Sequence, residues 1–238
     1  MLTEVPLLSY PECEGVAAGV RRLRELWIPR GIVPSSFYTL GLASYQDLSR
    51  PVPGYGRRDY YGELASRNSA ILAEFTWLFA RLQEALTIYL GAPTYFSRRC
   101  AVPGFHIFEA PAIPTGDVAS IHFDLQYQLL DWHDDDPPPN FDNPLSFTLP
   151  IQLPAAGGGL NLWEPTYHEV SNGPHQDLIA YAREHRPTVR HYRPGALVVH
   201  SGHRLHQIAG VSPVEPTDTR LTLQGHAMQR GERWILYW

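Results

Sequence analysis

The repeat pattern of apolar residues changes near residue 100, and this change limits what the chain can fold into. Before it, apolar residues recur at helical spacing in Gly15–Leu26 and again from about Glu63 to Tyr89. Gly91 and the residues after it end the second helical pattern. After residue 100, short apolar runs alternate with turn residues, which is typical of antiparallel strands. The order predicts helices first and a β structure second.

We expect strands separated by tight turns over most of the second part, with a polar, proline-rich loop at Asp131–Pro144 and a short helix at Gln176–Glu184. One further strand is predicted at Phe37–Leu42, and the C-terminal run Trp234–Trp238 reads as an edge strand. The predicted strands after residue 100 are Gly104–Glu109, Ala119–Leu129, Leu145–Leu153, Gly159–Trp163, Thr188–Tyr192, Ala196–His200, Arg204–Val211, Thr219–Met228 and Arg233–Tyr237.

This pattern predicts an α+β chain built on a β-sandwich or jelly roll. The length of 238 residues fits one domain. We expect residues 1–100 to supply helical and covering segments and residues 101–238 to form the β core.

The charged residues exclude several classes of function. The sequence contains no lysine, so all 19 basic residues are arginine. A pyridoxal phosphate Schiff base and a Walker-type phosphate loop both need lysine and are therefore excluded. The net charge of −5 argues against nucleic acid as a partner.

The two cysteines and the N-terminal residues bear on location. Cys13 and Cys100 form neither a CxxC motif nor a disulfide framework, so a reducing cytoplasmic setting is expected. No basic segment followed by an apolar run opens the sequence, and no run is long and apolar enough to cross a bilayer. We therefore expect no membrane partner.

The motif Ile121-His122-Phe123-Asp124 is the first candidate for chemistry. Side chains at positions i and i+2 of a strand share a face, so His122 and Asp124 can reach one point. Two histidines and one carboxylate on one side of a metal leave adjacent positions open, which suits non-haem Fe(II). A short His-x-Asp pair is weak evidence alone, and a third ligand from a distant strand is needed.

Three histidines compete for that third position: His200, His203 and His206. His206 is preferred because it precedes an apolar strand and leaves room for one hairpin before Arg220, and His203 is the alternative. Arg220 and Thr222 share one face of the following strand, where a guanidinium beside a hydroxyl suits a carboxylate. Arg204 could replace Arg220 if the strand register is shifted.

The order His-x-Asp, Pro-Gly turn, distal histidine and Arg-x-Thr resembles the Fe(II)- and 2-oxoglutarate-dependent oxygenases. The resemblance covers about Gly104 to Met228 and includes the glycine-rich strand entry at Gly157–Trp163. It implies a double-stranded β-helix (a cupin-like jelly roll) with supporting N-terminal helices. It further implies His122, Asp124 and His206 as Fe(II) ligands, and Arg220 with Thr222 as the partners of 2-oxoglutarate.

The expected activity is oxidation of a small molecule by O2, such as hydroxylation of an amino acid or a secondary metabolite at an unactivated C–H, with release of succinate and CO2. Alternatives are a cupin-type metalloenzyme that does not use 2-oxoglutarate, and a jelly-roll binding module without catalysis. The oligomeric state and the oxidised carbon are not readable. Residues expected to line a substrate pocket are Trp163, Gln224, His226 and Tyr127.

Two other groups receive ordinary structural interpretations. His106 in Gly104–Glu109 is interpreted as a core or pocket-wall histidine, because a strand histidine is usually only hydrogen-bonded. Asp134–Asp136 are interpreted as a solvated acidic loop, because prolines follow directly. The tyrosines of the covering segment Phe37–Tyr61 are mostly packing residues, with one or two facing substrate.

Overall fold

The computed structural model describes residues 2–31, 36–49, 59–116, 119–132, 137–171 and 177–238. The acidic loop Asp134–Asp136 and part of the covering segment lie outside these residues. The strands are β1 (Thr3–Pro6), β2 (Ile28–Arg30), β3 (Phe37–Leu40), β4 (Thr94–Phe96), β5 (Gly104–Glu109), β6 (Asn140–Gln152), β7 (Gly159–Thr166), β8 (Thr188–His191), β9 (Ala196–Ser201), β10 (Arg204–Ala209), β11 (Thr219–Arg230) and β12 (Arg233–Tyr237). The helices are α1 (Tyr10–Arg22), α2 (Ser44–Asp47), α3 (Tyr60–Glu74), α4 (Thr76–Leu90), α5 (Tyr167–Ser171) and α6 (Leu178–Glu184), with short 3-10 turns η1 (Arg24–Leu26), η2 (Ala110–Ala112) and η3 (Gln126–Leu129).

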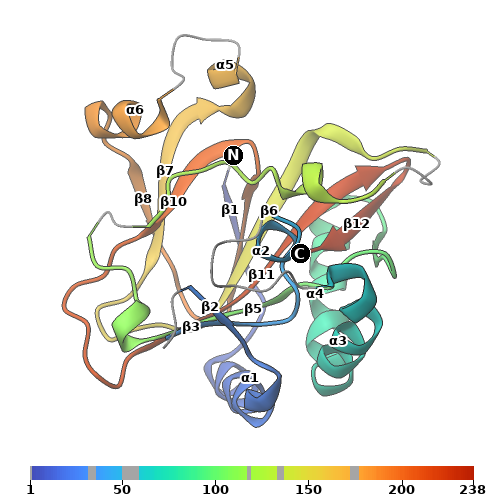
Figure 1. Cartoon of the computed structure of the whole chain (residues 1–238), viewed down its shortest axis with the longest axis horizontal. Coiled ribbons are helices and arrows are strands. Elements are labelled where there is room, and N and C mark those ends of the chain that lie inside the picture. The colour runs from blue at the N-terminus through green and yellow to red at the C-terminus, as the bar shows by residue number, and fades with distance from the viewer. Residues whose placement is uncertain (1, 32–35, 50–58, 117–118, 133–136, 172–176) are drawn as a thin grey trace.

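The strands form a large sheet and a small one (Figure 1). Within the described residues, the large sheet has nine strands, with the main order β1-β9-β6-β11-β5-β3-β2 and with β12 and β4 joined beside β11. The small sheet has three strands in the order β10-β7-β8, and an isolated bridge between His122 and His206 extends it beyond β10. These pairings are antiparallel except for β12 with β4, so the expected α+β architecture is present.

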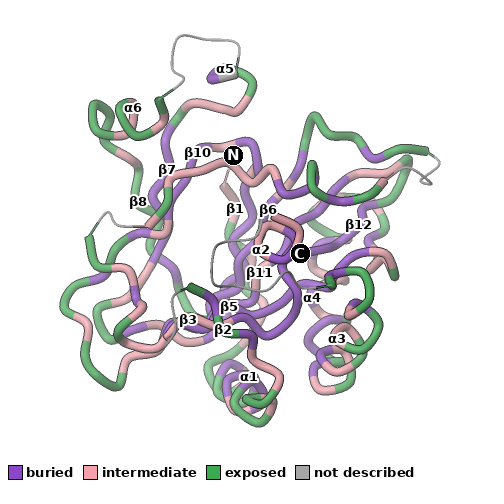
Figure 2. Tube along the Cα trace, in the orientation of Figure 1, coloured by how far each residue is buried: buried purple, intermediate pink, exposed green. Residues whose placement is uncertain are grey.

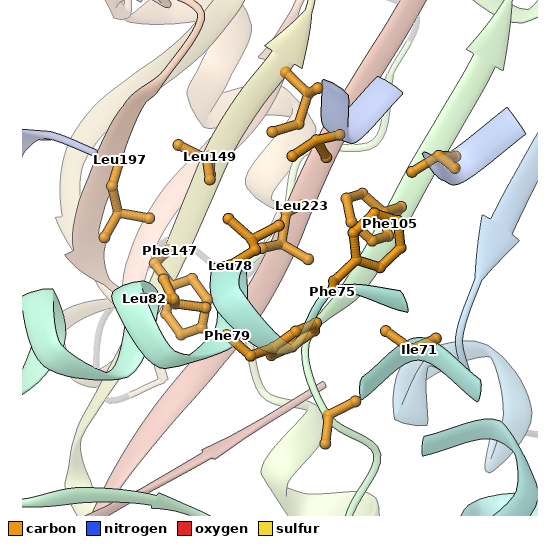
Figure 3. Close-up of a cluster of buried hydrophobic side chains, with 14 of the residues drawn as sticks. Ile71, Phe75, Leu78, Phe79, Leu82, Phe105, Phe147, Leu149, Leu197 and Leu223 are labelled. Carbon is orange, nitrogen blue, oxygen red and sulfur yellow. The ribbon is translucent and has the colours of Figure 1, made fainter. Parts of the chain in front are cut away.

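The core lies between the large sheet and helices α1, α3 and α4. Figure 3 shows Leu78, Phe79 and Leu82 of α4 lying against the sheet, close to Phe147 of β6 and Leu223 of β11. Leu78, Leu82 and Leu223 have no exposed surface. Burying each such side chain contributes about 2 kcal/mol, so this interface is the main source of stability.

Burial is uneven across the molecule. Figure 2 shows buried chain along β5, β6 and β11, whereas α6 and the outer strand β8 are exposed. Every residue of β8 is exposed, and Val189 keeps 45% of its surface. The small sheet therefore has one well-covered face and one solvated edge.

The helical part differs from the expectation at one point. The predicted helix from Glu63 to Tyr89 is two helices, α3 and α4, which meet at Phe75. Phe75 leaves helical geometry, with φ −116° and ψ 28°, and its buried ring tilts against Phe105 of β5. Tertiary packing of this ring outweighs the continuous apolar pattern. Gly91 ends α4 in the left-handed conformation, as its position predicted.

The predicted strand Ala119–Leu129 is wrong. The chain makes only the bridge at His122 and then turns into η3. The C-terminal strand is present as β12, but its predicted place at an edge is wrong, because β12 lies between β11 and β4 and Trp238 is fully buried. The alternation of apolar residues identifies a strand, but it does not tell which neighbours that strand will have.

The first residues add a strand that the sequence did not indicate. β1 pairs with β9, and the amides of Leu7 and Leu8 both donate to the carbonyl of Gly195, at 2.8 and 2.9 Å. Gly195 has φ +81°, and a Cβ there would lie 2.1 Å from the carbonyl oxygen of Leu8. The Pro-Gly turn thus needs glycine for close backbone approach. Cys13 and Cys100 are buried, and no disulfide joins them.

Among the described residues, no helix combines the length and the apolar character needed to span a membrane.

Candidate metal centre

His122, Asp124 and His206 come together at the edge of the small sheet. One ligand atom from each lies within 4.8 Å of the others. Nε2 of His122 is 3.7 Å from Oδ1 of Asp124, and Nε2 of His206 is 3.4 Å from Oδ2 of Asp124. The preferred distal histidine is therefore the one that the fold brings to the His-x-Asp motif.

Backbone hydrogen bonds fix the two segments against each other. The amide of His122 donates to the carbonyl of His206 at 3.0 Å, and the amide of His206 donates back at 3.0 Å. The amide of Asp124 donates to the carbonyl of Gly202 at 2.8 Å. One antiparallel bridge thus sets the positions of all three side chains, although no regular strand forms around Asp124.

Both imidazoles are oriented by their second nitrogen. Nδ1 of His122 lies 3.0 Å from the carbonyl of Ser120, and Nδ1 of His206 lies 2.8 Å from the carbonyl of Arg204. A carbonyl only accepts, so each Nδ1 carries the proton and each Nε2 keeps its lone pair facing Asp124. This is the arrangement that metal-binding histidines adopt.

The charges of His206 and Asp124 suit a divalent metal. Burial lowers the pKa of His206 to about 3, in spite of the opposing effect of Asp124. Burial alone would raise the pKa of Asp124, but the surrounding imidazoles, His206 foremost, hold that pKa below its ordinary value. Neutral imidazole and ionised carboxylate are the forms that bind metal, and two histidines with one carboxylate suit Fe(II).

A chain of hydrogen bonds from the large sheet holds Asp124. The hydroxyl of Ser146 on β6 donates to Oδ2 of Asp124 at 2.6 Å, and Nδ1 of His226 lies 3.1 Å from the same hydroxyl oxygen. The amide of Gln126 contacts Nε2 of His226 and lies 3.5 Å from Oδ1 of Asp124. Because Ser146 gives its only proton to Asp124, His226 must donate from Nδ1 and accept at Nε2.

The competing histidines lie elsewhere. Nε2 of His203 is 2.9 Å from the hydroxyl of Tyr127, which turns this ring away from the metal centre. His200 lines the same cavity as His206, with ring centroids 4.9 Å apart, but it is not part of the three-residue cluster. The alternative distal ligand, His203, is therefore not supported.

The three residues open into a cavity of about 670 Å³, which also contains Arg220. Arg220 is 1% exposed, and its Nε and Nη1 have no hydrogen-bond partner in the part of the chain that the structure describes. Its guanidinium lies over the rings of Phe108 and Tyr192, at 5.6 and 6.0 Å. Burial lowers the pKa of Arg220, but a guanidinium stays charged at neutral pH. A buried unpaired cation is costly, so the cavity is built for an anion.

Two residues considered as partners of the 2-oxoglutarate carboxylate, Thr222 and the alternative Arg204, do not line the cavity. Thr222 has no exposed surface, accepts a hydrogen bond from Gln224 at 3.3 Å, and does not line the cavity. Nε of Arg204 donates to the carbonyl of Trp163 at 3.0 Å, outside the cavity lining, so Arg204 does not replace Arg220. Thr148 and Tyr192, which line the cavity near Arg220, were not predicted.

Two of the four residues expected to line a substrate pocket do line the cavity, and two do not. Gln224 and His226 line the cavity, whereas Trp163 and Tyr127 do not. In β7 it is Leu160 that lines the cavity, so Trp163 points to the other face, where its indole donates to the carbonyl of His185 at 2.8 Å. Tyr127 belongs to η3 and faces His203, because the predicted strand around it does not exist.

His106 lines the cavity wall, which matches its interpretation as a pocket-wall residue. Two other lining residues, Gln46 and Trp238, were missed. Gln46 lies in a covering segment without a regular pattern, and Trp238 ends a strand that was expected at an edge. Neither position therefore indicated a residue that lines a cavity. Among the described residues of the covering segment, Tyr45 is the tyrosine that reaches this cavity.

A scan against protein-family models finds no match, and a search of curated proteins finds no relative. The structure is similar to that of an N-substituted L-amino acid dioxygenase from Burkholderia ambifaria AMMD, with a TM-score of 0.51, 14% identity, and coverage of 93% of this chain and 91% of that one. It is also similar to the non-heme alpha ketoglutarate dependent epimerase SnoN from nogalamycin biosynthesis, with a TM-score of 0.51, 11% identity, and coverage of 96% and 81%. These similarities confirm the double-stranded β-helix fold with N-terminal helices, while the function must be argued from the residues of this chain.

Proposed function

We propose that this chain is a non-haem Fe(II)- and 2-oxoglutarate-dependent oxygenase that acts on a small molecule. One observation carries the proposal. The cavity that contains the His122, Asp124 and His206 cluster also contains the unpaired guanidinium of Arg220. A metal site and an anion site in one cavity match a co-substrate that chelates metal at one end and carries a carboxylate at the other.

Different residues would bind the metal and the co-substrate. His122, Asp124 and His206 would hold Fe(II), and Arg220 would hold the distal carboxylate of 2-oxoglutarate by charge-assisted hydrogen bonds. Bound Fe(II) and 2-oxoglutarate supply the activation of O2 and the oxidation of the substrate. Phe108 and Leu160, both buried and in the cavity wall, keep water away from the reacting groups.

The reaction we propose is hydroxylation of an unactivated C–H, with release of succinate and CO2. The cavity of about 670 Å³ has the size of pockets that bind small organic molecules. The named activities of proteins with this fold, a dioxygenase and an epimerase, differ from each other, so the fold does not select the reaction. We treat residues 1–238 as one catalytic domain and expect it to act in the cytoplasm.

Two other functions are weaker. A cupin-type metalloenzyme without 2-oxoglutarate would leave the charge of Arg220 uncompensated in its cavity. A binding module without catalysis would have no need for two imidazoles with their lone pairs directed at one carboxylate. Each of these two functions predicts a different result in the succinate assay from the result expected for a 2-oxoglutarate-dependent oxygenase.

The test is formation of succinate from 2-oxoglutarate under air with added Fe(II), using a panel of amino acids and small metabolites. In parallel, anaerobic addition of Fe(II) and 2-oxoglutarate should produce the visible charge-transfer absorption of a metal-bound keto acid. Loss of this absorption in His206→Ala, and its retention in His203→Ala, is expected. A wild-type protein that binds Fe(II) but shows no absorption with 2-oxoglutarate would favour the cupin-type alternative.

A further inference from the structure

One wall of the cavity contains polar atoms that lack hydrogen bonds. Oε1 of Gln46, Nδ1 of His106 and Nε1 of Trp238 are buried and have no hydrogen-bond partner among the described residues, and all three residues line the cavity. We call them the Gln46–His106–Trp238 cluster. A buried polar atom without a partner costs about 1–3 kcal/mol, so three in one wall indicate a place for a ligand.

Trp238 is held in a slot made for its ring. A Cβ on Gly104 would lie 2.1 Å from the indole, and one on Gly41, where φ is +110°, would lie 3.4 Å from it. The backbone amide of Trp238 donates to the carbonyl of Ala101 at 2.9 Å. The indole therefore has a fixed position, because the missing Cβ of Gly104 leaves room for it and the backbone anchors it, whereas a Cβ on Gly41 would make only an ordinary van der Waals contact with it.

Gln46 and its neighbour Tyr45 are fixed by a buried ion pair beneath α2. The guanidinium of Arg30 donates to both carboxylate oxygens of Asp47, at 2.7 and 2.8 Å, and the amide of Ala43 donates to Asp47 at 2.7 Å. These bonds tie the short helix to β2. The covering segment thus presents Tyr45 and Gln46 to the cavity from a rigid support.

Tyr45 in turn fixes His106. The hydroxyl of Tyr45 lies 2.5 Å from Nε2 of His106, so in either tautomer Nδ1 is the nitrogen left without a partner. An aromatic platform lies beside it. The rings of Phe37 and Phe108 stack at 4.1 Å, and the ring of Phe37 meets that of His106 edge-on at 5.2 Å. Polar atoms next to a stacked aromatic pair suit a flat ring that bears a polar group.

The donors and acceptors of the cluster select against ionised groups. Burial first, and then the positive charges of Arg220 and Arg30, hold the pKa of His106 well below its ordinary value, so the imidazole is neutral. A ligand ammonium has only donors and would leave the indole N–H of Trp238 without an acceptor. A ligand carboxylate would meet the carbonyl oxygen of Gln46. A hydroxyl or an amide has both a donor and an acceptor and can satisfy both sides.

We propose that the Gln46–His106–Trp238 cluster is the substrate subsite for an uncharged hydroxyl or amide group carried on a flat, apolar ring. This subsite extends the proposed function and rests on it, because a ligand of the cluster is a substrate only if the chain is an oxygenase. The ionised groups of a free amino acid do not match this wall.

The probe is benzamide, with benzoate and benzylammonium as its charged counterparts, and binding is measured by titration calorimetry. The first arm uses protein loaded anaerobically with Fe(II) and 2-oxoglutarate, so that Arg220 is occupied. The second arm uses metal-free Arg220→Gln protein, in which benzoate cannot bind at that guanidinium. We expect benzamide to bind about tenfold or more tightly than either ion in both arms, as one unmatched buried polar pair would cause.

Variants assign the binding to the cluster. Gln46→Leu and Trp238→Phe each remove one polar partner and should weaken benzamide about fivefold to tenfold. The matched control is Gln128→Leu, because Gln128 lines the cavity outside the cluster, and it should change affinity by less than about twofold. If Trp238→Phe does not fold, the half-buried Gln46 provides the decisive variant.

The proposal is overturned if no probe binds, if a charged probe binds as well as benzamide, or if Gln128→Leu weakens binding as much as Gln46→Leu. Failure of the first arm alone, with no complex of Fe(II) and 2-oxoglutarate, would contradict the proposed function instead. In that case, selective benzamide binding in the second arm would still support the subsite.

Discussion

The two sheets contribute to the cavity in opposite ways. Arg220 lies on β11, which pairs with β5 and β6 inside the large sheet and packs Leu221 and Leu223 against the helices. His122 lies at a single bridge on the edge of the small sheet, and its side chain is 42% exposed. The candidate anion site is therefore built on a central strand that is paired on both sides, whereas the candidate metal site is built partly on a segment without regular structure.

This difference has a functional meaning. A guanidinium that must stay buried without a partner needs a support that cannot relax toward water. A metal site needs neighbouring space for a co-substrate and O2, which an open edge provides. The pairing and burial of each sheet thus suit its proposed role, and the following predictions test that division.

The largest effect is expected at the edge of the small sheet. His206→Ala removes a ligand, so Fe(II) binding and succinate formation should fall by more than about 100-fold, since even outer-shell changes cost 10- to 100-fold. Fe(II) affinity by anaerobic titration and succinate release measure this. His203→Ala is the matched control and should leave both within a few-fold. Equal losses in the two variants would contradict the placement of the distal ligand.

For stability, we expect the larger effect from a substitution that faces the large sheet and the smaller effect from one in the small sheet. Leu82→Ala removes a fully buried side chain between α4 and the large sheet and should lower the free energy of unfolding by about 3 kcal/mol. Val189→Ala, on the exposed strand β8, should change it by less than about 0.5 kcal/mol. Urea unfolding followed by circular dichroism measures both. A larger loss from Val189→Ala would show that the small sheet contributes more than its burial indicates.

Arg220→Gln should weaken the binding of 2-oxoglutarate without lowering the stability of the ligand-free protein. Loss of the charge-assisted bonds should weaken 2-oxoglutarate by about 10- to 100-fold. The ligand-free variant should be as stable as wild type or more so, because an unpaired buried charge is removed. The two measurements are the dependence of succinate formation on 2-oxoglutarate and a thermal melt without ligands. A clear fall in melting temperature would mean that Arg220 has a structural partner.

The smallest effect is expected where the large sheet supports the metal site. Ser146→Ala removes the hydroxyl that donates to Asp124, so Fe(II) affinity should fall about tenfold while the fold is kept. Ser146→Thr restores a hydroxyl and should recover most of the affinity. If alanine and threonine variants bind Fe(II) equally, the hydrogen bond to Asp124 does not position the metal site.

Much of the β architecture could be predicted because turn residues mark the ends of apolar runs. The predicted bounds Gly104–Glu109 and Arg233–Tyr237 are those of β5 and β12. The prediction failed where tertiary contacts outweigh the local pattern. Phe75 interrupts a continuous helical pattern, and the residues after His122 form no strand because backbone contacts to Gly202 and η3 replace it.

The site was predictable as a set of residue types, but the face of each side chain was not. His122, Asp124 and His206 converge as expected, because His-x-Asp keeps two side chains together even without a strand. Trp163 was assigned to the wrong face of β7, an error of one position in an alternating pattern. Trp238 was missed because the space for its indole depends on Gly104, which is distant in sequence.

The reciprocal backbone bonds between His122 and His206 have a consequence for how the centre opens. The two amides that face each other in this bridge belong to the backbone of two proposed ligands, so opening of the bridge would separate the two imidazoles. A metal that binds both imidazoles would oppose this opening, and hydrogen–deuterium exchange at the two amides should therefore slow together when the metal is bound. Metal retention and the opening rate of this short stretch of backbone would then be coupled.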